Sequence, residues 1–200
     1  QLAPMAHPNV VRVSNYCQDQ GVDCLVMEFV PGVTLDEVLR GGPLPESEIV
    51  NLGMQLADGL SAAHAQKLMH RDLKPGNLRV TPEGRLMILD FGLAKKLLDS
   101  SASTDSGRLT QEHTVPGTLP YMAPEQLLGR PVDSRVDIYA AGACLYEMAT
   151  GQILFPGRGE AELRTAILDE DPQRPRQVNP AISSGLERVI LRALAKQPQS

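Results

Sequence analysis

A chain of 200 residues is long enough for one domain, or for a large part of one, with a sizeable hydrophobic core. Its composition, 42% hydrophobic and 22% charged, is typical of a soluble globular protein and shows no low-complexity block. The 19 basic and 24 acidic residues give a net charge of −5 without any basic run, which argues against nucleic-acid binding by bulk charge but leaves room for a locally basic cleft.

The first predicted elements are two β-rich runs, VVRVSNY and DCLVMEFV, separated by the polar residues CQDQGV. We expect these runs to form an antiparallel pair. The following segment, PGVTLDEVLR, begins with Pro-Gly and offers Thr34 as the N-cap of a short helix. Residues 41–68 then predict a long amphipathic helix with acidic residues in its first turn. Its expected core positions are Ile49, Leu52, Leu56, Leu60 and Ala63.

Residues 78–92, LRVTPEGRLMILDFG, predict a β-hairpin because TPEG is turn chemistry between two β-rich runs. Residues 100–118 are rich in Ser, Thr and Gly and predict a long mobile loop, a kind that is often functional. Helical patterns dominate the rest of the chain. We expect an apolar helix over residues 137–150 and further helices over residues 160–168 and 186–196.

The stretch HRDLKPGN, residues 70–77, concentrates one imidazole, two cations, one carboxylate and one amide around a proline and a glycine. With the hairpin turn centred between Glu83 and Gly84, Asn77 faces Asp90 at the open end of the hairpin. Their amide and carboxylate oxygens suit one or two Mg²⁺ ions, which prefer hard oxygen ligands and take waters or phosphates as the rest of their shell.

Two further side chains of this stretch extend the chemistry. Asp72 supplies a carboxylate that holds no metal, and Lys74 supplies a point charge of the kind that binds a phosphate. A metal site, a carboxylate and a lysine together predict phosphoryl transfer. In that reaction Asp72 positions an attacking hydroxyl and accepts its proton, while Lys74 stabilises the charge on the transferred group.

Four stretches together resemble the bacterial eukaryotic-like serine/threonine protein kinases, and the resemblance covers nearly the whole chain. They are HRDLKPGN, the DFG of residues 90–92, GTLPYMAPEQ of residues 117–126 and VDIYAAGACLYEMATG of residues 136–151. The resemblance implies an α+β, protein-kinase-like fold. It makes residues 1–30 the remnant of the small N-terminal lobe with the hinge, and residues 31–200 the helical C-terminal lobe with the catalytic loop and the activation segment.

The same resemblance implies a protein kinase that transfers the γ-phosphate of ATP to serine or threonine hydroxyls of protein substrates, with Mg²⁺ as its metal ion. Asp72 is then the base and Lys74 contacts the γ-phosphate. Asn77 and Asp90 hold Mg²⁺. Thr118 is implied to hydrogen-bond within the constellation of Asp72 and Lys74. The presence of Lys74 favours a serine/threonine kinase over a tyrosine kinase.

The run VMEFV, residues 26–30, resembles the kinase hinge. There Met27 is the gatekeeper, and the backbone C=O of Glu28 and the N–H of Val30 bind adenine. Arg79 departs from the family, because it occupies the strand position that usually places an apolar side chain under the adenine. A guanidinium can stack on the face of a ring, so the nucleotide affinity is left open.

Two more residues of HRDLKPGN have implied roles away from the chemical step. His70 is implied to pack against Phe91 and not to act as an acid or a base. Arg71, beside the base, predicts a docking anion, which a phosphothreonine at Thr110 or Thr114 would supply. We therefore expect a second copy of the chain to phosphorylate the activation loop and thereby order it.

The sequence also departs from the family pattern at three other places. No GxGxxG and no VAIK-like run occurs, so the roof of the nucleotide site and the lysine that clamps the phosphates are absent from these residues. Glu125 of APEQ normally pairs with an arginine that would follow the end of this sequence, so we expect a marginally stable segment. Gly76 offers no carboxylate to read a basic substrate residue. A non-catalytic, pseudokinase-like scaffold is therefore the alternative to an active kinase.

Cys17, Cys24 and Cys144 are odd in number and show no CxxC spacing, so we expect reduced, largely packed thiols and no structural zinc site. No signal peptide and no run of eighteen apolar residues occurs, which predicts a cytoplasmic domain without a membrane segment. The chain begins at Gln1 in mid-pattern, which predicts a fragment. Any sensing domain or membrane anchor of the full-length protein would then lie outside it.

Overall fold

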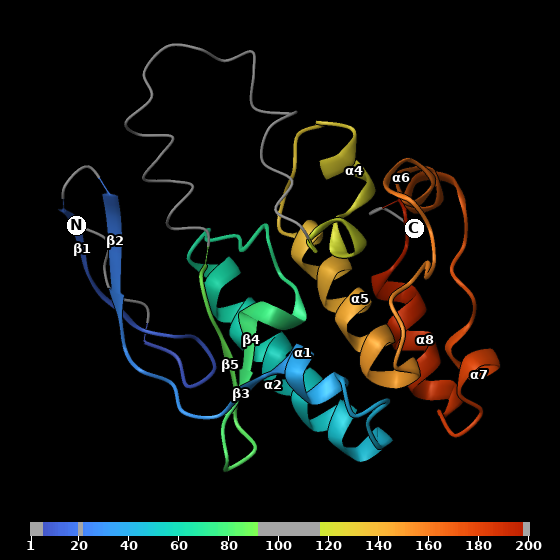
Figure 1. Cartoon of the computed structure of the whole chain (residues 1–200), viewed down its shortest axis with the longest axis horizontal. Helices are drawn as coiled ribbons and strands as arrows, with labels where there is room; N and C mark the ends of the chain where they lie inside the picture. Colours follow the sequence, from blue (N-terminus) through green and yellow to red (C-terminus); the bar gives the residue numbers. More distant parts are fainter. Residues whose placement is uncertain (1–5, 20–21, 92–116, 198–200) are drawn as a thin grey trace.

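Strands lie toward the N-terminal end of the molecule, and helices make up most of the rest (Figure 1). The computed structural model describes residues 6–19, 22–91 and 117–197. Its strands are β1 (Val13–Asp19), β2 (Val22–Met27), β3 (Val33–Thr34), β4 (Leu78–Val80) and β5 (Leu86–Ile88). Its α-helices are α1 (Leu35–Leu39), α2 (Glu46–Ala65), α4 (Pro124–Leu127), α5 (Arg135–Thr150), α6 (Glu160–Asp169), α7 (Pro175–Val178) and α8 (Ser184–Ala193), and 3₁₀ turns cover Pro75–Asn77 and Leu119–Tyr121. The expected α+β class is confirmed.

The first two strands form the predicted antiparallel pair. They extend further than expected, because residues 17–19 pair with residues 22–24 instead of belonging to a loop. The pair stands apart from the helices (Figure 1), and its Cys17 is exposed, so the expectation of packed thiols is wrong for this residue. Val11 does not extend β1. It donates its backbone N–H to the C=O of Ile88 at 3.0 Å and so attaches the start of the chain to β5.

The predicted hairpin is present as β4 and β5, but its register differs from the expected one by one residue. The N–H of Leu89 donates to the C=O of Asn77 at 2.9 Å, so Asn77 faces Leu89 and not Asp90. The turn occupies residues 82–84, and Gly84 closes it in the left-handed region with φ 76°. A three-residue turn with such a glycine moves the register by one relative to a two-residue turn.

A short strand that the sequence did not reveal, β3, pairs with β4 and completes a three-stranded sheet in the order β3-β4-β5. Its last residue, Thr34, is also the N-cap of α1, as predicted. The carboxylate of Glu37 accepts hydrogen bonds from the N–H of Thr34 at 2.8 Å and from its hydroxyl at 3.0 Å. The segment after residue 30 is therefore paired with β4, the strand that begins directly after Asn77.

The long helices α2 and α5 run through the middle of the helical part (Figure 1). All five apolar positions expected in α2 are buried. Helix α5 begins two residues before the expected range, where Asp133 Oδ1 accepts the N–H of Arg135 at 2.9 Å. Helix α8 begins and ends earlier than expected, with Ser183 as its N-cap. The sequence did not indicate α4 or α7, because four residues are too few to show a helical period.

Two glycines bring these elements into close contact. A Cβ at Gly142 of α5 would lie 2.8 Å from the Cβ of Ala193 in α8, closer than atoms pack. A Cβ at Gly59 of α2 would lie 2.7 Å from Cδ1 of Ile88 in β5. Helix α5 is thus held against α8, while α2 is held against the hairpin that flanks residues 70–77.

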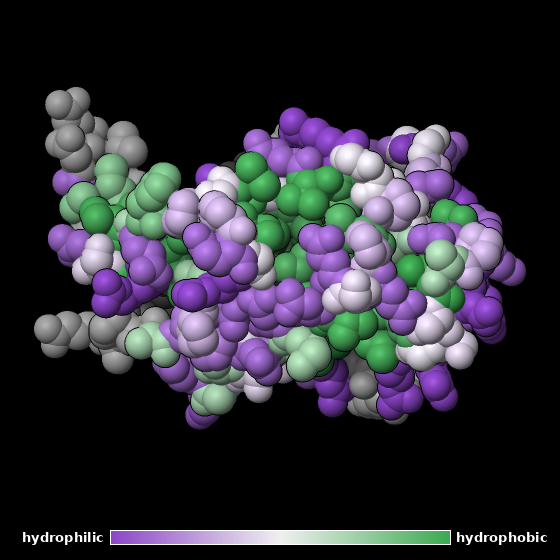
Figure 2. Space-filling model, turned by 90° about the horizontal axis from the view of Figure 1, so that it is seen from below, coloured by the Kyte–Doolittle hydropathy of each residue, from purple (hydrophilic) through white to green (hydrophobic). Residues whose placement is uncertain are grey.

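None of the helices in the described ranges is long and apolar enough to cross a membrane. In the view from below, polar residues alternate with apolar patches over the helical part (Figure 2). Among the large apolar side chains on the surface, Phe29 is 86% exposed and Met54 is 64% exposed. Phe29 lies in the predicted hinge.

Candidate active site

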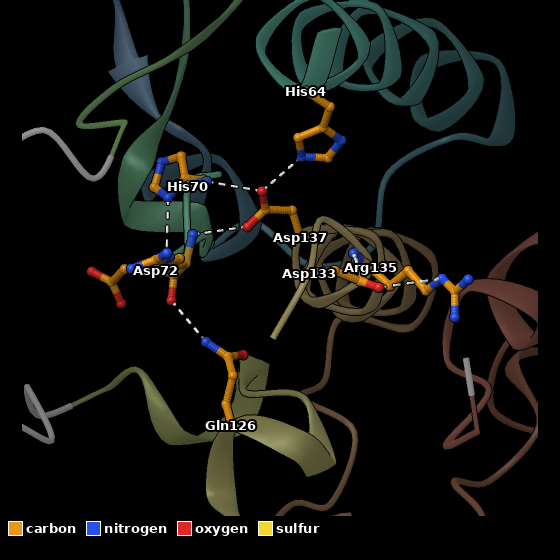
Figure 3. A network of polar contacts seen from close by, with 8 residues as sticks. His64, His70, Asp72, Gln126, Asp133, Arg135 and Asp137 are labelled. Carbon is orange, nitrogen blue, oxygen red and sulfur yellow. Dashed lines mark hydrogen bonds and ion pairs between the residues drawn. The ribbon is translucent and has the colours of Figure 1, made fainter. Parts of the chain in front are cut away.

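The loop of residues 70–77 is anchored to α5 by one buried carboxylate (Figure 3). Asp137 is 1% exposed, and its Oδ2 accepts the N–H of His70 while its Oδ1 accepts the N–H of Arg71, both at 2.8 Å. His64 of α2 adds a contact from its Nε2 to Oδ2, also at 2.8 Å. Arg71 has φ 66°, a left-handed conformation that costs energy in a non-glycine residue. The bonds to Asp137 hold the backbone in that conformation.

His70 is a structural link between this loop and the end of β5. It is 1% exposed, and its ring packs against Phe91 with the centroids 5.0 Å apart, the contact that the resemblance implied. Burial lowers the pKa of His70, which keeps the ring neutral. Its Nε2–H donates to the C=O of Leu89 at 2.7 Å, and its Nδ1 accepts the N–H of Asp72 at 3.3 Å. This tautomer uses both ring nitrogens, so neither is left for acid–base chemistry.

The structure brings four predicted site residues into one cluster. Lys74 Nζ lies 3.2 Å from Asp72 Oδ2 and donates to Thr118 Oγ1 at 2.8 Å. Asn77 Nδ2 donates to the backbone C=O of Asp72 at 2.8 Å and to its Oδ2 at 3.3 Å. The Asp72 side chain is 37% exposed and that of Lys74 is 17% exposed. The cluster therefore holds a carboxylate that solvent reaches and fixes its direction by two neighbours.

The candidate metal site lies at the open end of the hairpin. Since Nδ2 of Asn77 donates to Asp72, its Oδ1 is the atom that suits a cation. Asp90 is exposed in a left-handed conformation, φ 51°, one residue beyond the position opposite Asn77. The described residues contain no group of three or more His, Cys, Asp or Glu arranged for a metal. One amide and one carboxylate fit Mg²⁺, which takes the rest of its shell from waters and phosphates.

A small apolar cluster, separate from the main core, includes residues of the predicted hinge, where adenine is expected to bind. Val11, Val30 and Met87 are its buried members, with Met27 and Leu89 packed against them. The cluster joins the predicted hinge to β5. Glu28 of the same segment is fixed by its N–H, which donates to the C=O of Arg12 at 3.0 Å.

Arg79 places a charge beside this apolar cluster. It faces Met87 across β4 and β5, and its Nη2 donates to the C=O of Gly32 at 2.6 Å. Its Nε is buried and has no hydrogen-bond partner among the residues that the structure describes. Gly32 has φ 106°, and a Cβ there would lie 2.1 Å from the C=O oxygen of Val80, so only glycine permits this approach. The contact with Gly32 therefore fixes Arg79 at the strand position where the kinase family usually has an apolar side chain under the adenine.

Sequence reasoning missed two polar connections next to the site. The hydroxyl of Tyr121 donates to Glu147 Oε2 at 2.6 Å, and burial raises the pKa of both groups. Gln126 Nε2 donates to the C=O of Arg71 at 3.0 Å (Figure 3). A signal existed for the first, because a buried tyrosine hydroxyl needs a partner. Nothing in the spacing indicated the second.

Sequence reasoning also missed Asn9, which is 6% exposed. Its Nδ2 donates to the C=O of Leu86 at 2.8 Å and to Gln55 Oε1 at 3.0 Å. Gln55 Oε1 also accepts the N–H of Leu86 at 2.9 Å. These bonds connect the start of the chain, α2 and β5 behind the predicted site.

The remaining described residues singled out in the sequence lie outside the cluster around Asp72. Glu125 is half-buried and lines a cavity of about 520 Å³ that three arginines also line. These arginines are Arg135, Arg188 and Arg192. A Cβ at Gly76 would lie 3.9 Å from Asp36 Oδ1, the carboxylate oxygen nearest to that position. Thr110 and Thr114 lie outside the described residues.

Comparison with known proteins adds the family context. The model described as "Protein kinase domain" matches residues 1–200. The serine/threonine-protein kinase Pkn1 of Myxococcus xanthus is 40% identical over 199 residues, which cover 98% of this chain and 28% of that protein. The serine/threonine-protein kinase PknB of Mycobacterium leprae is 33% identical over 203 residues, 99% of this chain and 32% of that protein. The chain thus spans about a third of these relatives.

Proposed function

This chain belongs to the protein kinase family, and we propose that it is the catalytic part of a serine/threonine kinase that transfers the γ-phosphate of ATP to proteins. Residues 31–200 form the helical lobe with the catalytic loop, and residues 1–30 supply the hinge and the last strands of the small lobe. The domain works in the cytoplasm of the cell.

One observation carries this proposal, the cluster of Asp72, Lys74, Asn77 and Thr118. A carboxylate that solvent reaches lies 3.2 Å from an ammonium group, and an amide holds it from the other side. Such an arrangement suits a base that receives a proton from a substrate hydroxyl while a cation lies near the transferred group. The contact with Thr118 connects this cluster to the end of the activation segment.

Each residue has a distinct task in this reaction. Asp72 orients the serine or threonine hydroxyl of the substrate and takes its proton as the oxygen attacks phosphorus. Lys74 lies next to the charge that develops on the transferred phosphoryl oxygens and stabilises it. Asn77 and Asp90 would hold Mg²⁺, which neutralises phosphate charge when bound. Met27, Glu28 and Val30 would hold adenine at the hinge.

Substitution of the base tests the proposal. In the full-length protein, Asp72→Asn should lower phosphate transfer to a serine- and threonine-containing acceptor by about two orders of magnitude or more, because the amide cannot take the proton. Binding of ATP should change little. The measurement is radiolabelled phosphate incorporation beside calorimetric ATP binding.

Asp58→Asn, which changes the same side chain on the exposed side of α2, is the matched control and should keep wild-type activity. Undiminished transfer by Asp72→Asn would show that another group is the base.

Regulation by the activation loop is a further part of the proposal. Arg71 follows the anchored His70, and a phosphate on Thr110 or Thr114 would give its guanidinium an anionic partner. A second copy of the chain would deliver that phosphate. Mass spectrometry of active protein should find phosphate on one of these threonines, and its absence from fully active protein contradicts this regulation.

A non-catalytic, pseudokinase-like binding or scaffold module is the second candidate, and Arg79 is the observation that favours it. Its buried Nε has no acceptor among the described residues, so adenine at the predicted hinge site would lie near a cation that is already poorly solvated. Titration of the full-length protein with Mg²⁺ and ATP separates the two functions. Saturable binding at sub-millimolar ATP supports the kinase. No binding by the wild type, with binding restored by Arg79→Met, supports the scaffold.

A further inference from the structure

Two thiols face each other on the strand pair at the edge of the molecule. Cys17 of β1 and Cys24 of β2 are direct partners in the antiparallel register. Cys17 is exposed and Cys24 is half-buried, and neither is in a disulfide. The strand pair stands away from the helical part (Figure 1), and Cys17 is exposed on it.

The register satisfies the geometric requirements of a disulfide. Directly facing residues in an antiparallel pair have Cα atoms about 4.5 or 5.5 Å apart, depending on the hydrogen-bonding pattern. Their side chains point to the same side of the sheet. Disulfides span Cα separations of roughly 4.4–6.8 Å, so either kind of facing pair lies within reach. At such separations a disulfide can form by rotation of the two side chains, without a change of fold.

We propose that Cys17 and Cys24 form a reversible intrachain disulfide when the chain meets a small-molecule disulfide oxidant such as glutathione disulfide. This site goes beyond the proposed kinase activity and does not depend on it. Exposed disulfides between neighbouring strands are readily reduced, so this cysteine pair suits a transient redox site and not a permanent cross-link.

The exposures assign the order of the two steps. Cys17, the more exposed thiol, attacks one sulfur of glutathione disulfide as a thiolate, forms a mixed disulfide and releases one glutathione thiol. Cys24 then attacks Cys17 Sγ as a thiolate and releases the second glutathione. Both cysteine protons end on the two glutathione thiols, and the two electrons lost by the cysteines reduce the oxidant. Cys144 takes no part, because it is buried and burial raises the pKa of its thiol.

Intact-mass spectrometry of the chain treated with glutathione disulfide tests the first claim. The expected product has lost two hydrogen atoms, carries no glutathione and returns to the original mass with dithiothreitol. Cleavage before Asp19 and Asp23, which lie between the two cysteines, should leave two peptides joined by a bond. A lasting glutathione adduct, a disulfide-linked dimer or two unjoined peptides would overturn the proposal.

Single variants test the order of the steps. Cys24→Ser should accumulate one glutathione on Cys17, since the thiol that resolves the mixed disulfide is missing. Cys17→Ser should react more slowly than Cys24→Ser. The matched control Cys144→Ala should give the same product as the wild type, and circular dichroism checks that each variant is folded. If Cys24→Ser remained unmodified while the wild type reacted, Cys17 would not be the attacking thiol, and the assigned order would be wrong.

Discussion

Glu147 is a half-buried carboxylate whose pKa is raised by burial, and a hydrogen bond of 2.6 Å from the hydroxyl of Tyr121 partly compensates the lost hydration. Removal of that hydroxyl by Tyr121→Phe should lower the free energy of unfolding by about 1–2 kcal/mol at neutral pH. The loss should be smaller in acid. The hydrogen bond from Tyr121 favours the charged carboxylate, so its removal raises the pKa of Glu147 further above the ordinary glutamate value. The variant therefore loses more stability than the wild type as the pH rises above that value and the carboxylate must ionise.

Urea unfolding of both proteins at pH 5 and pH 7 measures this difference. Tyr146→Phe removes a tyrosine hydroxyl from α5, the helix that carries Glu147, without removing the bond between Tyr121 and Glu147, and it serves as the control. An equal loss at both pH values would mean that the hydroxyl fills space and does not compensate the carboxylate.

Single residues also show where sequence reasoning was sufficient. The contacts of His70 with Phe91 and of Lys74 with Thr118 were implied by the resemblance to the kinase motifs, and both are present in the structure. The bond between Tyr121 and Glu147 joins two segments that no shared motif relates. Its existence depends on how α5 packs against the end of the activation segment, and a spacing pattern does not contain that information.

At the scale of elements, the contact between α5 and α8 depends on one missing side chain. Gly142→Ala would place a Cβ 2.8 Å from the Cβ of Ala193, so the helices must move apart. We expect a loss of about 1–3 kcal/mol in the free energy of unfolding, although alanine is the better helix former. Urea or thermal unfolding measures it.

Gly185→Ala is the matched control, because the nearest atom to its added Cβ is 3.6 Å away and α8 should gain slightly. Ala193→Gly in the Gly142→Ala background should recover part of the loss, since it removes the clashing atom. No recovery would place the cost of Gly142→Ala elsewhere.

Elements with a long period were predictable and short connections were not. Helices α2 and α5 bury apolar residues over four turns or more, so the pattern located them. The register of β4 and β5 depends on whether the turn takes two or three residues, and TPEG is compatible with both. The left-handed Gly84 decided it, and no periodicity reports the sign of a φ angle.

Across the whole molecule, Asp137 connects the reacting loop to the two longest described helices. Asp137→Asn replaces an oxygen that accepts a hydrogen bond with an NH₂ group that faces a donor. The stability of the fold and the rate of phosphate transfer should therefore both decrease. We expect a loss of about 2–4 kcal/mol in stability together with a loss of activity in the full-length protein. Thermal unfolding and phosphate transfer measure the two effects.

Comparison with Asp72→Asn separates the two roles. That variant should lose activity and keep the wild-type unfolding temperature, because Asp72 is partly exposed and anchors no second helix. If Asp137→Asn kept its stability while losing transfer, the residue would act in the chemical step and not as an anchor.

The approach of Gly32 to Val80 has a practical consequence for genetics. A single added methyl group at residue 32 would collide with the backbone of β4 at 2.1 Å and would also be strained at φ 106°. It would push residue 32 away from Val80, while the side chains of the predicted site stayed chemically unchanged. A loss-of-function allele found at this glycine would therefore report a displaced contact between Gly32 and β4, and it would not identify a residue that takes part in the reaction.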